Sequence, residues 1–517
     1  MNSAPPSTRW LQLLLPFACA LVVIGAHYWL IAYAASPTPF DDQWAAEAAK
    51  LYPHFFNGTL GLSDLIASHG EHRLLMTRLW SLLLLELDGS WDSILQMLAN
   101  TLVLGVYTMA LITAFRPLLS LASWMVFASF VAFEYALPCA WATTIFGFDS
   151  QRYFVLLFSF VGLVVMAGAP ALTLRWWLAV LLIVASYFSM ASGTATAAAA
   201  AVLCALQIAV GRRTGWREWP ALALLAALIA GMVLAVPPVV GDEALRAHSV
   251  GHFIEAFTEV MSWPAAIGIT FVPIRLLGML LLNWPAWLVS LEAIRTRPPL
   301  SDRRWLVAAL SGWIVLHAGL VAYGRAVAPV QARYVDIIML GLAVNAACLL
   351  YLSQKFQIWR RWRPAAVVAA LWLLPLLIGL GESVFKQAIP AIAERRADGL
   401  VQTENLRAYL ESGDIGALLN KTPLVAIPYG DPQRLAELAA SPVIRPLLPA
   451  ELVGQASVER AQQNGLARWT GHAVASLKSI ALRWGALLIP LGLFLFASAA
   501  ILQWRRGRFP LPSQLPP

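Results

Sequence analysis

The chain has 517 residues, of which 59% are hydrophobic and only 12% are charged. Soluble globular domains carry about 25% charged and about 45–50% apolar residues, so this composition excludes a soluble protein. The formal net charge of +8 comes from short basic clusters between hydrophobic runs. Without a contiguous basic face, that charge does not indicate a nucleic-acid-binding protein.

Apolar runs of about 20 residues, the length that crosses a bilayer core about 30 Å thick, recur along almost the whole chain. We therefore predict an all-α polytopic membrane protein with about twelve transmembrane helices. The first run exceeds the roughly 7–15 residues of a signal-peptide core, so we interpret it as an uncleaved anchor. The predicted spans lie near 11–34, 93–115, 118–138, 153–169, 174–191, 193–210, 219–237, 274–294, 305–323, 335–353, 364–381 and 478–503.

Basic residues gather in alternate connections between these spans, and this distribution predicts the orientation. With both termini in the cytoplasm, every short basic loop lies inside, as the positive-inside rule requires. The apolar segment 74–87 is only fourteen residues long and contains Arg78, so we predict that it lies in the interface or packs against the bundle. The residues placed inside are Arg116, Arg175, Arg212, Arg213, Arg217, the arginines from Arg295 to Arg304, Lys355, Arg360, Arg361, Arg363, Arg505, Arg506 and Arg508.

This orientation divides the chain into a transmembrane core, a small outer region and a last helix with a basic cytoplasmic tail. The respective residues are 1–381, 382–477 and 478–517. The core carries a large first outer loop at 35–92 and further outer loops at 238–273 and 324–334. The short loops and the lack of paired cysteines suit a bacterial inner membrane, with the first outer loop in the periplasm.

Two adjacent carboxylates, Asp41 and Asp42, follow directly after the first predicted span. At the membrane surface, a carboxylate can deprotonate an incoming hydroxyl group or bind a divalent cation. The alternative is that Asp41 simply caps an amphipathic helix at 42–52, because Asp is a favoured N-cap residue.

The stretch Ser68-His69-Gly70-Glu71-His72-Arg73, followed by Arg78, is densely ionisable for so apolar a chain. Arginine suits a phosphate group, and His or Glu can relay protons or bind a metal. The alternative is a solvated turn before the next helix. The spacing matches no strong metal signature, so a divalent cation is left open as the one candidate cofactor. The weak candidate ligands are Asp41, Asp42, Glu71 and His72.

Lys and Arg are usually enriched in cytoplasmic loops, so positive charge in the short outer loop 324–334 is unusual. Arg325 and Arg333 lie there, and Tyr334 follows. A polyprenyl-phosphate head group at this depth would explain the two arginines. The alternative is that Arg333 and Tyr334 anchor the chain at the interface and pair with Asp336.

Ionisable side chains at membrane depth are functional candidates by default, although pairing inside the bundle explains them equally well. Here they are Glu134, Asp149, Arg152 and His317. In loop 238–273, four ionisable residues share one helical face, which fits an interfacial amphipathic helix or, alternatively, a surface that binds a metal or an acceptor. They are His248, His252, Glu255 and Glu259.

An acidic pair after the first span, in a long outer loop on a bundle of about a dozen helices, resembles the GT-C superfamily of integral-membrane glycosyltransferases. The stretch Phe40-Asp41-Asp42-Gln43-Trp44 is similar to that family's first-loop acidic motif in type and position. The 68–73 stretch looks like a His-x-Glu-His-Arg element of bacterial members. The Gly324-Arg325 … Arg333-Tyr334 loop looks like their later phosphate-contacting Arg-Tyr element.

The resemblance implies inverting transfer of a sugar from a polyprenyl-phosphate donor to a periplasmic glycan, lipid or protein acceptor. It implies that Asp41 or Asp42 is the general base. The implied donor-binding residues are Arg73, Arg78, Arg325, Arg333 and Tyr334. The implied site-shaping residues are His69, Glu71, His72, Glu134, Asp149 and Arg152.

Two other functions fit a multi-span protein of this kind. A transporter or flippase for a small molecule or a lipid-linked glycan needs ionisable residues near the bilayer midplane and often has paired repeats, whereas here the polar residues crowd the outer interface. An O-antigen polymerase or ligase has a large late loop with essential arginine and histidine, and the late region here contains one histidine, His472.

Overall fold

A computed structural model describes residues 6–237, 242–356, 362–454 and 465–508. The predicted positions of Arg360 and Arg361, the start of the 238–273 loop and the end of the tail lie outside these ranges. The described chain is all-α apart from one small antiparallel hairpin, which pairs β1 (Ser68–His69) with β2 (His72–Arg73).

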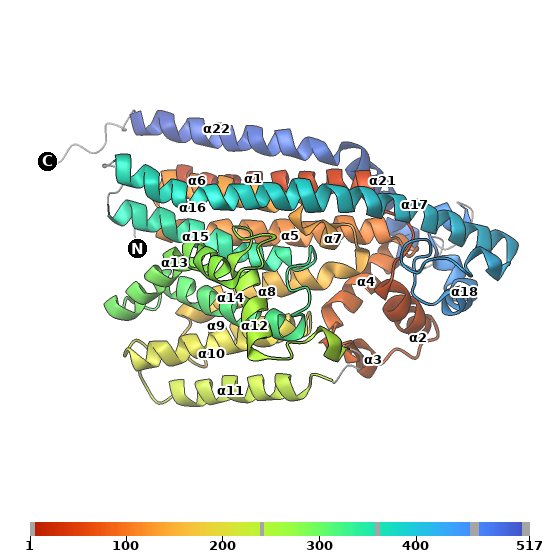
Figure 1. Cartoon of the computed structure of the whole chain (residues 1–517), viewed down its shortest axis with the longest axis horizontal. Helices are drawn as coiled ribbons and strands as arrows, with labels where there is room; N and C mark the ends of the chain where they lie inside the picture. Colours follow the sequence, from red (N-terminus) through yellow and green to blue (C-terminus); the bar gives the residue numbers. More distant parts are fainter. Residues whose placement is uncertain (1–5, 238–241, 357–361, 455–464, 509–517) are drawn as a thin grey trace.

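Ten helices in the described residues are long and apolar enough to cross a membrane, which makes this a multi-pass integral membrane protein. They run side by side along the long axis of the molecule (Figure 1). The elements that form them are α1 (Pro6–Ala34), α5 (Ser93–Phe115), α6 (Leu121–Ala136) with α7 (Trp141–Thr144), α8 (Ser150–Gly168), α10 (Thr194–Ala209), α13 (Val272–Thr296), α14 (Arg304–Gly324), α15 (Val335–Lys355), α16 (Trp362–Glu382) with α17 (Ile389–Ser412), and α21 (Ala467–Trp484) with α22 (Leu488–Arg508).

The described residues contain ten candidate spans rather than the predicted number of about twelve, because two of the predicted apolar runs form shorter helices. These are α9 (Leu174–Tyr187) and α11 (Glu218–Leu234), with 14 and 17 residues. Helix α9 ends early because the chain turns at Ser189–Gly193, where a Cβ on Gly193 would overlap the backbone of Ser186. The segment 74–87 forms α4 (Leu75–Asp88) and is not among the candidate spans.

Several helices begin where the side chain of a residue just before the first turn accepts a backbone N–H, as favoured N-cap residues do. Asp92 caps α5, Ser120 caps α6 and Thr173 caps α9. In the 238–273 loop, Ser249 caps α12 (Val250–Ser262). His248 therefore lies before this helix, and the predicted four-residue face loses its first member.

The first and last spans pack against each other in opposite directions. Gly25 of α1 lies beside Ile489, and Gly492 of α22 lies beside Val22. Small residues at such crossings let two transmembrane backbones approach closely. The start of α1 and the end of α22 consequently lie at the same end of the bundle (Figure 1).

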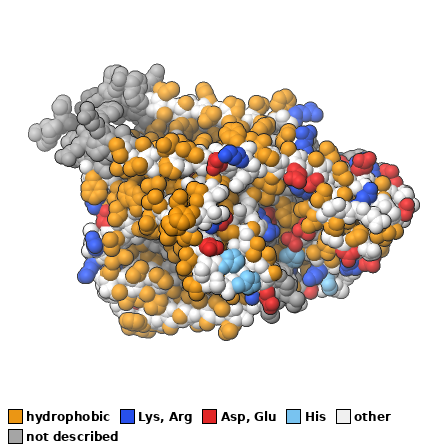
Figure 2. All heavy atoms as spheres, in the orientation of Figure 1, with side chains coloured by type: hydrophobic (Ala, Val, Ile, Leu, Met, Phe, Trp, Pro, Cys, Tyr) orange, Lys and Arg blue, Asp and Glu red, His pale blue; other side chains and the backbone are white. Residues whose placement is uncertain are grey.

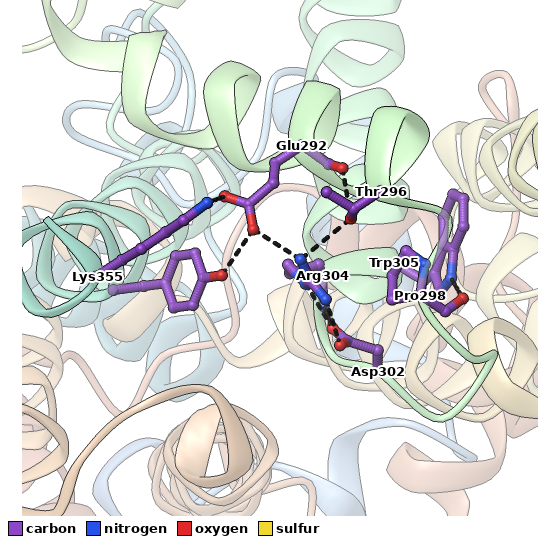
Figure 3. Close-up of polar contacts among 8 residues, drawn as sticks. Glu292, Thr296, Pro298, Asp302, Arg304, Trp305 and Lys355 are labelled. Carbon is purple, nitrogen blue, oxygen red and sulfur yellow. Dashed lines mark hydrogen bonds and ion pairs between the residues drawn. The ribbon is translucent and has the colours of Figure 1, made fainter.

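At that end, an ion-pair network joins three spans (Figure 3). The Glu292 carboxylate of α13 accepts from Arg304 Nη1 of α14 at 2.6 Å and pairs with Lys355 Nζ of α15 at 2.7 Å. Arg304 also pairs with Asp302 at 2.8 Å. Two cations and two carboxylates balance, so the network stabilises the helix ends without adding net charge. Basic side chains mark the left-hand end in the space-filling view (Figure 2).

Close packing between α16 and the segment that follows α12 depends on Gly379, where an added Cβ would overlap the carbonyl group of Pro264. We expect Gly379→Ala to destabilise the protein by about 1–3 kcal/mol, because the obstacle is backbone and one helix must shift. Gly381 has nothing within 4 Å of an added Cβ, so Gly381→Ala is the matched control. Thermal unfolding in detergent compares the two variants, and equal melting temperatures would refute the packing constraint.

At the opposite end, α16 continues through a π-helical turn (Ser383–Ala388) into α17, so the predicted boundary at residue 382 falls inside one helical run. This run projects beyond the bundle together with α18 (Pro432–Ala440) (Figure 1) and is followed by α19 (Ala450–Val453). A hydrophobic core joins this region to the first loop. Its members include Trp44, Trp91, Leu406, Ile427 and Leu435.

Candidate functional site

The first loop lies at the projecting end of the bundle and consists mostly of short helices. After a π-helical segment (Gln43–Leu51) come α2 (Tyr52–Phe56), α3 (Leu62–Ile66), the β1–β2 hairpin and α4. The surface over the spans is largely apolar, whereas acidic, basic and histidine side chains gather toward the projecting end (Figure 2). The first loop therefore lies where acidic and histidine side chains gather on this face of the molecule.

Asp41 and Asp42 are held in an unusual backbone conformation between the first span and this π-helical segment. Asp41 has a φ of +46°, in the left-handed region that few residues other than glycine, asparagine and aspartate adopt. Its backbone N–H donates to the Pro428 carbonyl at 2.7 Å. The residue at the N-cap position is Asp42, and its side chain forms no capping hydrogen bond. The interpretation of Asp41 as a helix cap is therefore wrong.

The two neighbouring carboxyl groups have opposite pKa shifts. Burial and the adjacent Asp42 carboxylate raise the pKa of Asp41 to about 6, against the opposing charges of Arg333, His69 and Arg395. Burial also acts to raise the pKa of Asp42, but its bond to His69 and the charges of His69 and Arg333 outweigh burial and lower it. Carboxyl groups whose environments separate their pKa values in this way are a common source of paired acid–base roles.

The β1–β2 hairpin holds the Asp42 side chain in position through His69. The Oδ1 atom of Asp42 lies 2.9 Å from Nε2 of His69, and the imidazole ring packs edge-on against Phe148 at 5.5 Å between centroids. The turn between β1 and β2 contains Gly70 with a φ of +55°, which favours glycine at this position. The hairpin thus places His69 against the acidic pair.

A second ion pair joins the hairpin turn to the later outer loop. Arg325 Nη2 donates to Glu71 Oε1 at 2.7 Å, and His72 Nε2 lies 3.7 Å from the same carboxylate. Burial, with the charges of Arg152 and Arg325, lowers the pKa of His72 to about 4, so this imidazole is neutral at pH 7. The structure therefore brings Arg325 to the neighbouring residues Glu71 and His72, although Arg325 lies 254 positions from Glu71 in the sequence.

Arg333 and Tyr334 of the later outer loop also lie near the acidic pair, since the charge of Arg333 acts on both carboxyl groups. The Tyr334 ring contacts the Arg333 guanidinium at 5.4 Å and that of Arg152 at 5.0 Å. Arg152 is in turn paired with Asp149 at 3.0 Å. Arg333 donates to the neutral Gln331 side chain, so the predicted alternative in which it pairs with Asp336 is wrong. Its positive charge is therefore not neutralised by that contact.

Arg73 and Arg78 donate to backbone carbonyl groups. Arg73 binds the carbonyl oxygens of Ile66 at 3.0 Å and Ala235 at 2.9 Å. Arg78, which is only 4% exposed, binds those of Leu65 at 2.7 Å and Ala67 at 2.6 Å. These contacts hold the first loop in place, and phosphate binding by the two arginines stays a prediction.

Glu134 of α6 and His317 of α14 are buried among the packed helices. Glu134 is fully buried, and its two carboxyl oxygens have no hydrogen-bond partner among the described residues. His317 stacks on Trp313 at 5.1 Å. Neither side chain contacts the acidic pair, so the predicted site-shaping role of Glu134 could act only from a distance.

A buried carboxylate that was not predicted, Glu47, is bonded to Gln43, the residue that directly follows the acidic pair. Glu47 is 1% exposed and accepts hydrogen bonds from Trp91 Nε1 at 2.7 Å and Gln96 Nε2 at 3.0 Å, and also from Ser81 and Gln43. Burial raises the pKa of Glu47 in spite of these bonds. Gln43 also accepts from the Phe40 N–H at 3.0 Å, so this network holds both ends of the Phe40–Gln43 segment. The four-residue spacing of Gln43 and Glu47 was the available signal.

Arg395 of α17 was missed as well. Its guanidinium lies 3.8 Å from the centroid of the Phe40 ring, beside the acidic pair. Nothing in the local sequence around residue 395 indicates this contact, because it depends on how the last third of the chain packs over the first loop.

The four weak candidate metal ligands, Asp41, Asp42, Glu71 and His72, do not gather into one cluster. Asp42 binds His69, and Glu71 binds Arg325. Among the described residues, no group of three or more histidine, cysteine, aspartate or glutamate side chains is arranged to hold a metal ion.

No family model, no curated protein and no solved structure matches this chain.

Proposed function

We propose that this protein is an inverting membrane glycosyltransferase that moves a sugar from a polyprenyl-phosphate donor to a hydroxyl group of a glycan, lipid or protein acceptor. One observation carries the proposal: a carboxyl group with a pKa of about 6 adjoins a second, ionised carboxylate at one end of an apolar helix bundle. The positive charge of Arg333 lies close enough to both carboxyl groups to oppose the effect of burial on their pKa values. A base and a phosphate-binding cation at the membrane surface are what this chemistry requires.

In the proposed reaction, Asp41 is the general base, because its pKa lies nearest to neutral pH and a base works best there. The acceptor oxygen attacks the anomeric carbon, the bond from that carbon to the phosphate oxygen breaks, and Asp41 takes the hydroxyl proton. The leaving group is the polyprenyl phosphate. Asp42, held by His69, orients the acceptor and the sugar.

Arg333 is the proposed partner of the leaving phosphate, because its guanidinium donates to the neutral Gln331 side chain rather than to a carboxylate, and its charge acts on both Asp41 and Asp42. Tyr334 and Arg152 support it from one side. Arg325 has a structural role in this proposal, since its charge is engaged by Glu71. The lipid chain would follow the apolar helix surfaces into the bilayer.

The proposed orientation places the basic end of the bundle in the cytoplasm of a bacterium and the acidic pair in the periplasm. Its support is the uneven charge, since Arg116, Arg175, Arg212, Arg295 and Lys355 all belong to connections or helix ends opposite the acidic pair. A polyprenyl-phosphate donor presented on the outer leaflet would then reach Arg333 directly.

Donor binding tests the proposal first. We expect the protein in nanodiscs to bind at least one polyprenyl-phosphate sugar from a panel, and Arg333→Ala to weaken that binding by roughly 10–100-fold, the usual range for a charge-assisted contact. Arg434 of α18 is exposed and paired with Glu437, so Arg434→Ala is the control. If no lipid-linked sugar binds, or if both variants lose binding equally, the proposed donor is wrong.

A transporter for a small solute or a lipid-linked glycan is the second candidate, and Glu134 favours it. A buried, unpartnered carboxyl group within a span is typical of ion-coupled transport. In proteoliposomes, solute uptake that Glu134→Gln abolishes and Asp41→Asn leaves unchanged would favour transport over sugar transfer.

A further inference from the structure

A cavity of about 360 Å³ lies at the basic end of the bundle, far from the acidic pair along the chain's spans. It is bounded by the end of α8, the first turn of α9 and the loop that leads into α14. Its volume falls within the range of about 300–1,000 Å³ typical of small-molecule sites. Arg175, Ser301, Asp302 and Arg303 supply its polar lining.

The two arginines of this cavity carry charge that the described protein does not neutralise. No hydrogen bond or ion pair to the guanidinium group of Arg175 or Arg303 forms within the described ranges. Asp302 also lines the cavity, but both of its carboxylate oxygens accept from Arg304, at 3.0 and 2.8 Å. Since that carboxylate belongs to the balanced network of Figure 3, the cavity keeps an excess of two positive charges.

The neighbouring ionisable pair does not change this balance. Arg213 and Glu218 meet at 3.4 Å beside the end of α8, and Arg213 also donates to the carbonyl oxygens of Met166 and Ala169. Their charges cancel. Arg175 and Arg303 are therefore left to attract an anion from outside the protein.

The loop that carries Arg303 is fixed by its own contacts, so the cationic position does not depend on a ligand. Trp305 Nε1 donates to the Pro298 carbonyl at 3.1 Å, a contact drawn in Figure 3. The Asp302 N–H donates to the Pro299 carbonyl at 2.9 Å. Two consecutive prolines further restrict the backbone. A preorganised loop of this kind lowers the entropic cost of binding.

The remaining wall of the cavity is apolar and continues onto the lipid-facing surface. Val164 and Leu178 line it, and Leu178 is 48% exposed. A ligand here would have its anionic group against two guanidinium groups and an aliphatic part along α8 and α9. That division of polar and apolar surface matches a phospholipid better than a free soluble anion.

We propose that this cavity binds the phosphate of an anionic phospholipid head group between Arg175 and Arg303, with an acyl chain along Val164 and Leu178. Guanidinium groups suit phosphate oxygens bidentately, and basic pockets between transmembrane helices bind anionic head groups. The site is separate from the acidic pair and does not depend on the proposed glycosyl transfer.

The test measures lipid retention by the full-length protein with native mass spectrometry in a neutral detergent, titrating phosphatidylglycerol against phosphatidylcholine. We expect Arg175→Gln/Arg303→Gln to weaken the tightest phosphatidylglycerol binding at least tenfold and to leave phosphatidylcholine binding unchanged. The control, Arg212→Gln/Arg217→Gln, removes the same charge from exposed positions at the same end and should retain that binding.

A second arm separates the two sources of phosphate. Inorganic phosphate at millimolar concentration, in the same detergent, should not displace the bound phosphatidylglycerol. Inorganic phosphate would be the better occupant if it displaced phosphatidylglycerol from the wild type but not from the Arg175/Arg303 variant. That result would overturn the lipid as occupant and assign the cavity to a soluble phosphate compound. If the two double variants lose phosphatidylglycerol to the same extent, the binding is only general charge attraction and the site is refuted.

Discussion

The Asp41→Asn variant is expected to bind the lipid-linked donor normally and to turn it over about a thousandfold more slowly, because a positioned general base typically contributes 10²–10⁴-fold. Asparagine suits the test, since it tolerates the left-handed backbone at φ +46° and removes only the ionisable group. Single-turnover transfer with a saturating donor measures the chemical step directly.

Asp42→Asn provides the contrast. If Asp42 orients substrates through His69, its loss should raise KM more than it lowers kcat. In the wild type, kcat/KM should fall about tenfold per pH unit below about 6, as Asp41 becomes protonated, because only the carboxylate can accept a proton. A flat profile between pH 5 and 7, or full turnover by Asp41→Asn, would rule out Asp41 as the base.

Glu47→Ala is expected to produce the largest loss of stability among single substitutions in the first loop. It would leave Trp91 Nε1, Gln96 Nε2 and the Ser81 hydroxyl buried without their acceptor, and each such group costs about 1–3 kcal/mol. We expect a loss of about 4 kcal/mol after partial relaxation. The apparent melting temperature in detergent should fall by several degrees, and the fluorescence of buried Trp91 should shift to longer wavelength.

Two further variants make this test specific. Glu47→Gln keeps one acceptor oxygen and should be destabilised less than Glu47→Ala. Glu404 lies exposed on α17, so Glu404→Ala should leave the melting temperature unchanged. If Glu47→Ala has the same melting temperature as the wild type, the buried network does not stabilise the first loop, and its proposed support of the acidic pair is wrong.

The sequence was sufficient for the spans because a continuous apolar run has few alternatives to a helix in a membrane. Runs such as 93–115 and 335–353 became α5 and α15 almost unchanged. The run at 174–191 did not, because the tight turn that follows Tyr187 is set by contact between two backbone segments, which hydropathy does not report.

Proximity within the first loop was also predictable, since Asp42 and His69 belong to the same loop and carry complementary groups. The partners of the arginine side chains, by contrast, were not predictable from the sequence. Arg73 and Arg78 carry the same charge as Arg333, yet they donate to carbonyl groups whose positions depend on the folded loop. The contacts of Asp41 with Pro428 and of Phe40 with Arg395 join distant segments, and a single sequence contains no signal for them.

The hydrogen bond from the Asp41 N–H to the Pro428 carbonyl also has a consequence for how the protein is made. The acidic pair leaves the ribosome early, but the segment that fixes its backbone is translated only after nine of the ten candidate spans have begun. Lys478, which pairs with Asp92, is translated later still. A nascent or prematurely terminated chain therefore inserts into the membrane without a completed polar end, and that end takes shape only when synthesis is nearly finished.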